Sequence, residues 1–222
     1  MTNFTHRFRG LTPTTHISLT VLLFSISFAW LLPPAYGKEN GPVEWLQVVV
    51  LGLTALVSIS ALLQTNLAPA RRRLFALTSV IWLLSIAREL SWGRTFYTTS
   101  TGGIPSLKSL WYGPYVYPSI AVIVFAAFGY FFANGIHKEL ILWLKQGILP
   151  LLDFGIVGAA MFIADMIEHH SGGVFGARTE LFEELWELGA YCAVLSFMIN
   201  VVWSKQFQTD QPTLPRGKDK AI

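Results

Sequence analysis

The sequence predicts an all-α fold, a polytopic transmembrane helix bundle with about six spans and both termini cytoplasmic. Of its 222 residues, 53% are hydrophobic and only 13% are charged, whereas soluble proteins carry about 25% charged residues. Stretches without a charged residue recur along the chain, at 17–37, 45–70, 74–87, 115–136 and 188–204. Most of them approach or exceed the roughly 20 apolar residues that cross a bilayer as a helix.

The first half of the chain is expected to hold three spans. A basic N-terminal stretch precedes the first apolar run, as in a signal peptide, but the run is long and ends at Pro33 without a clear cleavage site. We therefore interpret residues 15–35 as an uncleaved first span. The next two charge-poor runs predict helices at 42–66 and 72–92.

The second half is expected to hold three more spans, at 115–134, 148–169 and 178–204. Residues 137–146 between the first two of these are amphipathic and short, which is typical of a helix lying in the membrane interface. Proline and charged residues are frequent in 205–222, a composition that predicts a disordered cytoplasmic tail. The transmembrane domain is therefore assigned to residues 1–204.

The lysines and arginines predict the orientation. With the N-terminus inside, the outer loops hold four of them, Lys38, Arg94, Lys108 and Arg178. The cytoplasmic side holds a larger set, comprising Arg7, Arg9, Arg71, Arg72, Arg73, Lys138, Lys145, Lys205, Arg216, Lys218 and Lys220. The positive-inside rule favours this arrangement, and an even number of spans agrees with it. The expected location is the bacterial inner (plasma) membrane, crossed several times.

The composition also indicates which binding partners to expect. The formal net charge is +3, but the basic residues flank apolar runs, so we expect the lipid bilayer as partner and no nucleic acid. The single cysteine, Cys192, excludes an intrachain disulfide, and its place inside an apolar run indicates a packing role.

Acidic residues gather at the expected outer end of the bundle. They are Glu39, Glu44, Glu89, Asp165, Glu168, Glu180, Glu183, Glu184 and Glu187, joined by His169 and His170. Ionisable groups in or beside a bilayer are costly, so a one-sided cluster points to function. Those predicted to lie deepest, Glu89, Asp165 and Glu187, are the candidate catalytic carboxylates, and Arg88 is a candidate anion clamp.

Helical spacing suggests a metal site within this cluster. Asp165 and His169 are four residues apart, so they share one face of a helix. Glu184 and Glu187 are three apart on the next helix. Carboxylates combined with imidazole at such spacings resemble the way helix bundles hold metal ions. Asp165, His169, Glu184 and Glu187 are the predicted ligands, and the cofactor they suit is a divalent metal.

Structural roles explain the same residues in another way. His169 and His170 would cap the last carbonyls of their helix, and Glu180 and Glu183 would complement the positive N-terminus of the next. Arg88 would form a structural ion pair with Asp165 or Glu187.

Two short motifs resemble known proteins. Glu39-Asn40-Gly41-Pro42-Val43-Glu44-Trp45 and Glu89-Leu90-Ser91-Trp92-Gly93 are similar to sequences in a group of uncharacterised bacterial multi-span inner-membrane proteins with a Glu-[Ile/Leu]-Ser-Trp-Gly motif. In that group a glutamate often precedes the second motif, where this chain has Arg88. The resemblance implies membrane location and no particular activity.

Three functions remain open on these grounds. The first is a metal-dependent membrane enzyme that acts on a lipid-linked or envelope substrate, since a bound metal would activate water or polarise a phosphoryl or acyl oxygen. The second is an ion- or proton-coupled transporter or channel. The third is a structural partner in a membrane complex. Because only the first of the three is an enzyme, the sequence leaves open whether the chain has enzymatic activity.

Overall fold

The computed structural model describes residues 13–64, 67, 69–99, 103–145, 151–170 and 173–203, and every regular element in these ranges is a helix. The predicted all-α class is confirmed. The tail expected at 205–222, together with residues 146–150 around the start of the fifth predicted span, lies outside the described residues.

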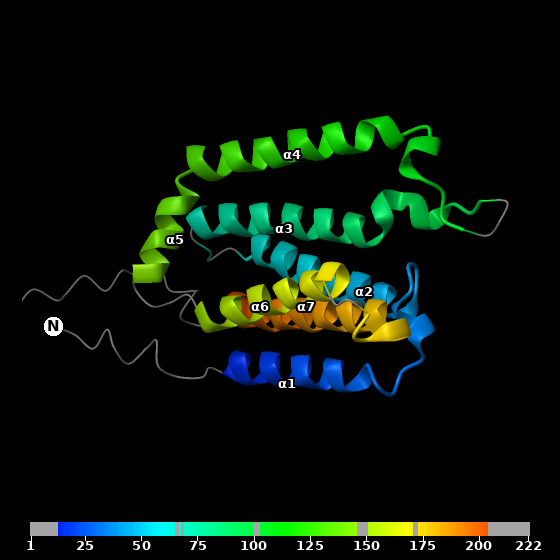
Figure 1. Cartoon of the computed structure of the whole chain (residues 1–222). Helices are drawn as coiled ribbons and strands as arrows, with labels where there is room; N and C mark the ends of the chain where they lie inside the picture. The colour runs from blue at the N-terminus through cyan, green and yellow to red at the C-terminus, as the bar shows by residue number, and fades with distance from the viewer. Residues whose placement is uncertain are drawn as a thin grey trace, which may run out of the picture.

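Six long helices alternate in direction along the bundle (Figure 1). They are α1 (Pro13–Phe28), α2 (Pro42–Leu62), α3 (Pro69–Glu89), α4 (Gly113–Ala133), α6 (Leu151–His170) and α7 (Thr179–Trp203). The shorter α5 (Ile136–Lys145) lies crosswise at one end, the end at which α1 begins. We call this the inner end and the opposite one the outer end.

Prolines set several of the helix starts. Pro13, Pro42 and Pro69 are the first residues of α1, α2 and α3, and Pro114 is the second residue of α4. Proline suits the first turn because its φ is already helical and the N–H it lacks would have no partner inside the helix. These positions explain why α1, α3 and α4 begin earlier than predicted, and why α2 begins at the predicted residue.

Three predicted spans end several residues earlier than expected. The first was expected to reach residue 35, but α1 ends at Phe28, and a 3₁₀ turn, η1 (Pro34–Gly37), begins at the second proline of the Pro33-Pro34 pair. The second was expected to reach residue 66, but α2 ends at Leu62. The third was expected to reach residue 92. It ends at Glu89 because Ser91, Trp92 and Gly93 have φ of 48°, 57° and 86° in η2 (Ser91–Phe96), a left-handed conformation that cannot continue an α-helix.

Helix α7 forms the centre of the bundle and packs against α1, α2 and α6, while α3 packs on α2. Two glycines permit close approach: a Cβ on Gly37 would lie 2.3 Å from the Leu181 Cα, and one on Gly189 would lie 2.5 Å from the Leu22 Cδ1. These contacts bring η1 and α1 directly onto α7.

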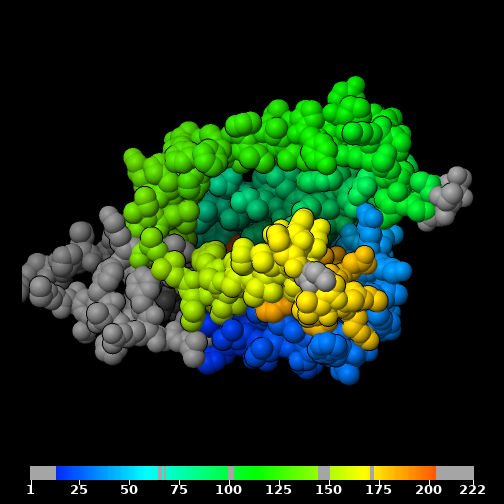
Figure 2. Space-filling view, in the orientation of Figure 1, coloured from blue at the N-terminus to red at the C-terminus, as the bar shows by residue number. Residues whose placement is uncertain are grey.

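Helix α4 stands apart from the rest. Figure 2 shows a hollow between α4 and α6, with α3 at its floor. None of the apolar window of α4 is buried inside the protein, although it is one of the most apolar segments of the chain. Such a surface is suited to contact with lipid.

Among the described residues, three helices are long and apolar enough to cross a membrane by length and composition: Pro42–Leu62, Gly113–Ala133 and Gly176–Trp203, the last including η4 (Gly176–Arg178). Thr14–Phe28 is apolar but shorter. Helices α3 and α6 are of similar length but carry charged residues at both ends, such as Arg71 and Glu89 in α3.

Candidate functional site

Three helices bring acidic side chains together near the outer end of the bundle. Glu44 lies in the first turn of α2, Glu89 is the last residue of α3, and Glu184 and Glu187 lie in the second and third turns of α7. Because α2 and α7 begin where α3 ends, these positions meet. With Gln47 of α2 they form what we call the interior cluster, comprising Glu44, Gln47, Glu89, Glu184 and Glu187.

One ion pair neutralises part of this cluster. The Arg88 Nη2 donates to the Glu187 Oε1 at 3.0 Å, and the Arg88 Nε lies 3.9 Å from the Glu89 Oε1. Glu187 is buried, whereas about half of the Arg88 side chain is exposed. Of the two partners expected for Arg88, Asp165 and Glu187, the structure selects Glu187.

Glu89 has a second partner from α7. The Tyr191 hydroxyl donates to the Glu89 Oε1 at 2.8 Å, and both residues are buried. Tyr191 lies one turn after Glu187 on the same helix, so both side chains are on the face of α7 that meets the end of α3. Sequence reasoning missed Tyr191, although its spacing from Glu187 was a usable signal.

Gln47 is the other residue that sequence reasoning missed. Its side chain is fully buried, and its Nε2 donates to the Glu184 backbone oxygen at 2.8 Å and to the Glu184 Oε2 at 2.7 Å. Its Oε1 is buried with no hydrogen-bond partner. Gln47 follows Glu44 by three residues, the spacing that places two side chains on one helix face.

The interior cluster has more acidic groups than basic ones. Glu44, Glu89, Glu184 and Glu187 are electrostatic neighbours of one another, and Arg88 is the guanidinium paired with them. Like charges this close in a medium of low dielectric constant repel strongly. The cluster therefore favours uptake of protons or of a cation.

The two motifs that carry the family resemblance meet beside this cluster. The Glu39 Oε1 accepts hydrogen bonds from the Arg94 Nη2 at 3.0 Å and from the Ser91 hydroxyl at 3.2 Å. Asn40 donates its backbone N–H to the Glu44 carboxylate and accepts from the Trp45 indole at 2.7 Å. The first motif thus positions Glu44 and contacts the second.

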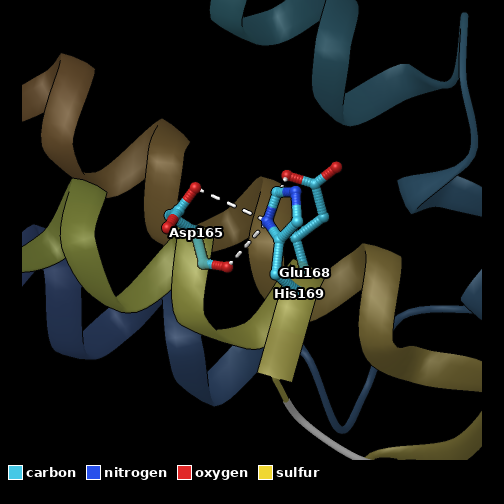
Figure 3. A group of neighbouring side chains, drawn as sticks. All are labelled: Asp165, Glu168 and His169. Atoms are coloured by element: carbon cyan, nitrogen blue, oxygen red, sulfur yellow. Dashed lines mark hydrogen bonds and ion pairs between the residues drawn. The ribbon is translucent and has the colours of Figure 1, made fainter.

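A separate acidic group lies on the outside of α6. Asp165, Glu168 and His169 each offer a ligand atom, and these atoms lie within 4.8 Å of one another. The His169 Nδ1 is 3.5 Å from the Asp165 Oδ1 and 3.4 Å from the Glu168 Oε2. Figure 3 shows the imidazole between the two carboxylates, and more than half of each side chain is exposed.

The four predicted metal ligands are therefore divided between two places. Asp165 and His169 belong to the exposed group on α6, whereas Glu184 and Glu187 belong to the interior cluster. Within the ranges the structure describes, Asp165, Glu168 and His169 are the one set of three or more His, Cys, Asp or Glu side chains whose ligand atoms all lie within 4.8 Å of one another. Glu183, an electrostatic neighbour of both Glu168 and Glu187, lies between the two places.

Asp165 was also expected to lie at the depth of Glu89 and Glu187, and in the structure its side chain faces outward from the bundle, with 64% of it exposed. The reason is helical phase: Ala160, Ala164 and Ile167 are the buried residues of this part of α6, and Asp165 falls beside them rather than among them. The His169 Nδ1 also lies 3.2 Å from the Asp165 backbone oxygen, the contact expected of a histidine that caps the end of a helix.

We compared the chain with family models, curated proteins and solved structures, and none of them matches it. The class that the fold and the site define is thus a helical protein with membrane-length apolar helices and an acidic interior. The resemblance through the Glu-Leu-Ser-Trp-Gly motif stays a prediction.

Proposed function

We propose that this chain is a six-span bacterial inner-membrane protein that takes up a cation at the interior cluster, in ion- or proton-coupled transport. The observation that carries the proposal is the charge of the interior cluster: it brings four carboxylates together, and the one guanidinium of Arg88 pairs with them. In the orientation set by the positive-inside rule, this cluster lies near the periplasmic face.

The alternating directions of the six long helices support the even number of spans. Helices α3 and α6 would cross the bilayer with their charged ends at the two surfaces or inside the bundle, where ionisable groups are tolerated. Under this arrangement α4 faces lipid on most of its surface.

The donor chemistry of the cluster supports a hard cation or a proton. All its ligand atoms are oxygens, from four carboxylates and the Gln47 amide, and oxygen donors suit Mg²⁺, Ca²⁺ and Mn²⁺. Buried carboxylates in membrane helices are also typical of proton relays.

Buried polar side chains continue below the cluster along α2 and α3, as they would along an ion pathway. Gln47, Thr54 and Ser58 are fully buried along one face of α2, and the Ser58 hydroxyl accepts from the Trp82 indole at 3.0 Å. Ser79 of α3 is buried as well. Polar residues inside membrane bundles mark ion pathways, and the same residue types also form the hydrogen bonds of structural helix contacts.

Transport is tested in proteoliposomes containing the purified full-length protein, with a pH-sensitive dye enclosed. We expect a cation gradient to drive proton movement through the wild type and the Glu180→Gln variant, whose substituted residue is exposed on α7. Glu187→Gln should abolish it. Equal dye responses from all three proteins and from protein-free liposomes would rule out transport.

A second candidate is the metal-dependent enzyme acting on a lipid-linked or envelope substrate. The grouping of Asp165, Glu168 and His169 favours it, because carboxylate and imidazole donors would hold a divalent metal at the outer surface. Metal analysis of the purified His169→Ala protein tests this, with His170→Ala as the matched control. Loss of metal in the first variant alone would support the metal site that the enzyme requires, and equal content in both would exclude this group as the ligand set.

A further inference from the structure

Arg71, in the first turn of α3 at the inner end, is a buried cation that forms no ion pair with any residue the structure describes. The residue is 8% exposed, and its Nε and Nη1 atoms are buried with no hydrogen-bond partner. No salt bridge joins it to an acidic side chain in the described part of the chain. Buried guanidinium groups are normally paired, because a charge removed from water without compensation is costly.

The surroundings of Arg71 are apolar on one side. Its Cζ lies 5.6 Å from the centroid of the Trp143 ring of α5, a cation–π distance. Phe75, one turn further along α3, belongs to the same buried cluster as Trp143. The acidic residue of α5, Glu139, accepts the Trp143 indole N–H at 2.8 Å. Ring contact alone leaves the buried guanidinium donors unsatisfied.

The remaining local groups also attract an anion. Arg72 and Arg73 follow directly and are exposed, and the Arg72 Nη2 donates to the Gln64 backbone oxygen at 3.0 Å. Helix α3 has 21 residues, and Arg71 is its third. The first backbone N–H groups of a helix lack partners inside it and carry the positive end of the helix dipole. Phosphate groups bind at such positions.

Setting the membrane orientation does not explain this burial. Arg72 and Arg73 already place positive charge at the inner surface, where exposed side chains meet the headgroups. An arginine that served orientation alone would extend its charged end toward water in the same way. Arg71 differs from both neighbours in being enclosed.

We propose that Arg71 and the first turn of α3 bind a phosphate-bearing anion at the inner end, with a phospholipid headgroup as its source. The guanidinium fork would donate to two phosphate oxygens, and Trp143 would hold the guanidinium plane. The crosswise α5 lies at this end of the bundle, at the level expected of headgroups (Figure 1). Basic pockets between membrane helices on the cytoplasmic side bind headgroups in this manner.

The test uses the purified full-length protein in a maltoside detergent and native mass spectrometry. The probes are dioctanoyl phosphatidylglycerol, inorganic phosphate and dioctanoylglycerol, which lacks the phosphate. We expect the wild type to bind one phosphatidylglycerol at low concentration and dioctanoylglycerol much more weakly. Arg71→Gln should weaken phosphatidylglycerol binding by roughly tenfold or more, the effect of losing charge-assisted hydrogen bonds.

Arg73→Gln is the matched control, because it removes the same charge from an exposed position two residues away; we expect a change of less than about threefold. Arg71→Lys and Arg73→Lys give a second comparison if Arg71→Gln fails to fold. Lysine keeps the charge but not the fork, so we expect weaker binding for Arg71→Lys alone.

The sources are separated by the other probes. Binding of inorganic phosphate as tightly as the lipid, lost in the Arg71 variants, supports the phosphate site with free phosphate as its ligand. Equal binding of phosphatidylglycerol by the Arg71 and Arg73 variants overturns the proposal, and so does equal binding of dioctanoylglycerol and phosphatidylglycerol by the wild type.

Discussion

Arg88 of α3 reaches across to Glu187 of α7 at 3.0 Å, although a glutamate is its immediate neighbour in the sequence. The next residue, Glu89, accepts from Tyr191 of α7 at 2.8 Å. Two consecutive residues thus make polar links from α3, which packs mainly on α2, to the central helix. Adjacent helical residues point about 100° apart, so Arg88 and Glu89 meet two different groups on α7.

Removing the Arg88 charge should destabilise the bundle. Arg88→Gln leaves the buried Glu187 carboxylate without its counter-ion, and since Arg88 is half exposed we expect a loss of about 1–3 kcal/mol in the free energy of unfolding. Arg94→Gln breaks the pair with Glu39, whose carboxylate side chain is 55% exposed, and should cost about 0–1 kcal/mol. Denaturant unfolding in detergent checks both. An equal loss of unfolding free energy in the two variants would contradict the claim that burial of the Glu187 carboxylate makes its ion pair important.

The Tyr191 hydroxyl should contribute to stability through Glu89. Tyr191→Phe removes one donor from a buried carboxylate while keeping the ring, and we expect a cost of about 1–2 kcal/mol. Tyr115→Phe removes an exposed hydroxyl on α4 and should have an effect within about 0.5 kcal/mol. Thermal unfolding of the two variants in the same detergent provides the comparison; a neutral Tyr191→Phe would show that Glu89 does not need this donor.

Gly37 should tolerate no side chain. A Cβ there would lie 2.3 Å from the Leu181 Cα, so Gly37→Ala must push η1 away from α7, at an expected cost of about 1–3 kcal/mol. Gly52 of α2 has nothing within 4 Å of such a Cβ, and Gly52→Ala should be neutral or stabilising because alanine favours the helix. Unfolding midpoints of the two variants measure this, and the reverse order would contradict the packing.

The orientation can be measured by cysteine labelling in intact cells. In a Cys192→Ala background, a membrane-impermeant maleimide should label Ser109→Cys in the outer loop and leave Lys138→Cys in α5 unlabelled until the cells are opened. Both positions are exposed in the fold. Labelling of Lys138→Cys alone in intact cells would place the interior cluster on the cytoplasmic side.

The helical class and most helix positions follow from charge-poor runs, because a bilayer requires such runs and prolines mark where they begin. The ends were less predictable. Ser91, Trp92 and Gly93 stop α3 through left-handed backbone angles, and only Gly93 signals such a conformation in the sequence.

The site was predicted in part. The sequence places Arg88 and Glu187 near the outer ends of two apolar helices, so Glu187 was one of the two partners predicted for Arg88. The rotation of α6 could not be read from spacing alone, and it leaves Asp165 on the outside. Gln47 was missed because a single amide in an apolar helix carries no pattern, and its role depends on contact with Glu184 on a helix 137 residues away.

The central claim is that the interior cluster binds a cation, and calorimetric titration of the purified full-length protein tests it most directly. Mg²⁺, Ca²⁺, Mn²⁺ and Na⁺ are titrated in two buffers of different ionisation enthalpy, which reports any protons displaced. We predict that one of these cations binds the wild type and Glu180→Gln with proton release, and binds Glu184→Gln and Glu187→Gln at least about tenfold more weakly. Unchanged binding in the Glu184 and Glu187 variants, or no binding and no proton exchange in the wild type, would contradict the account.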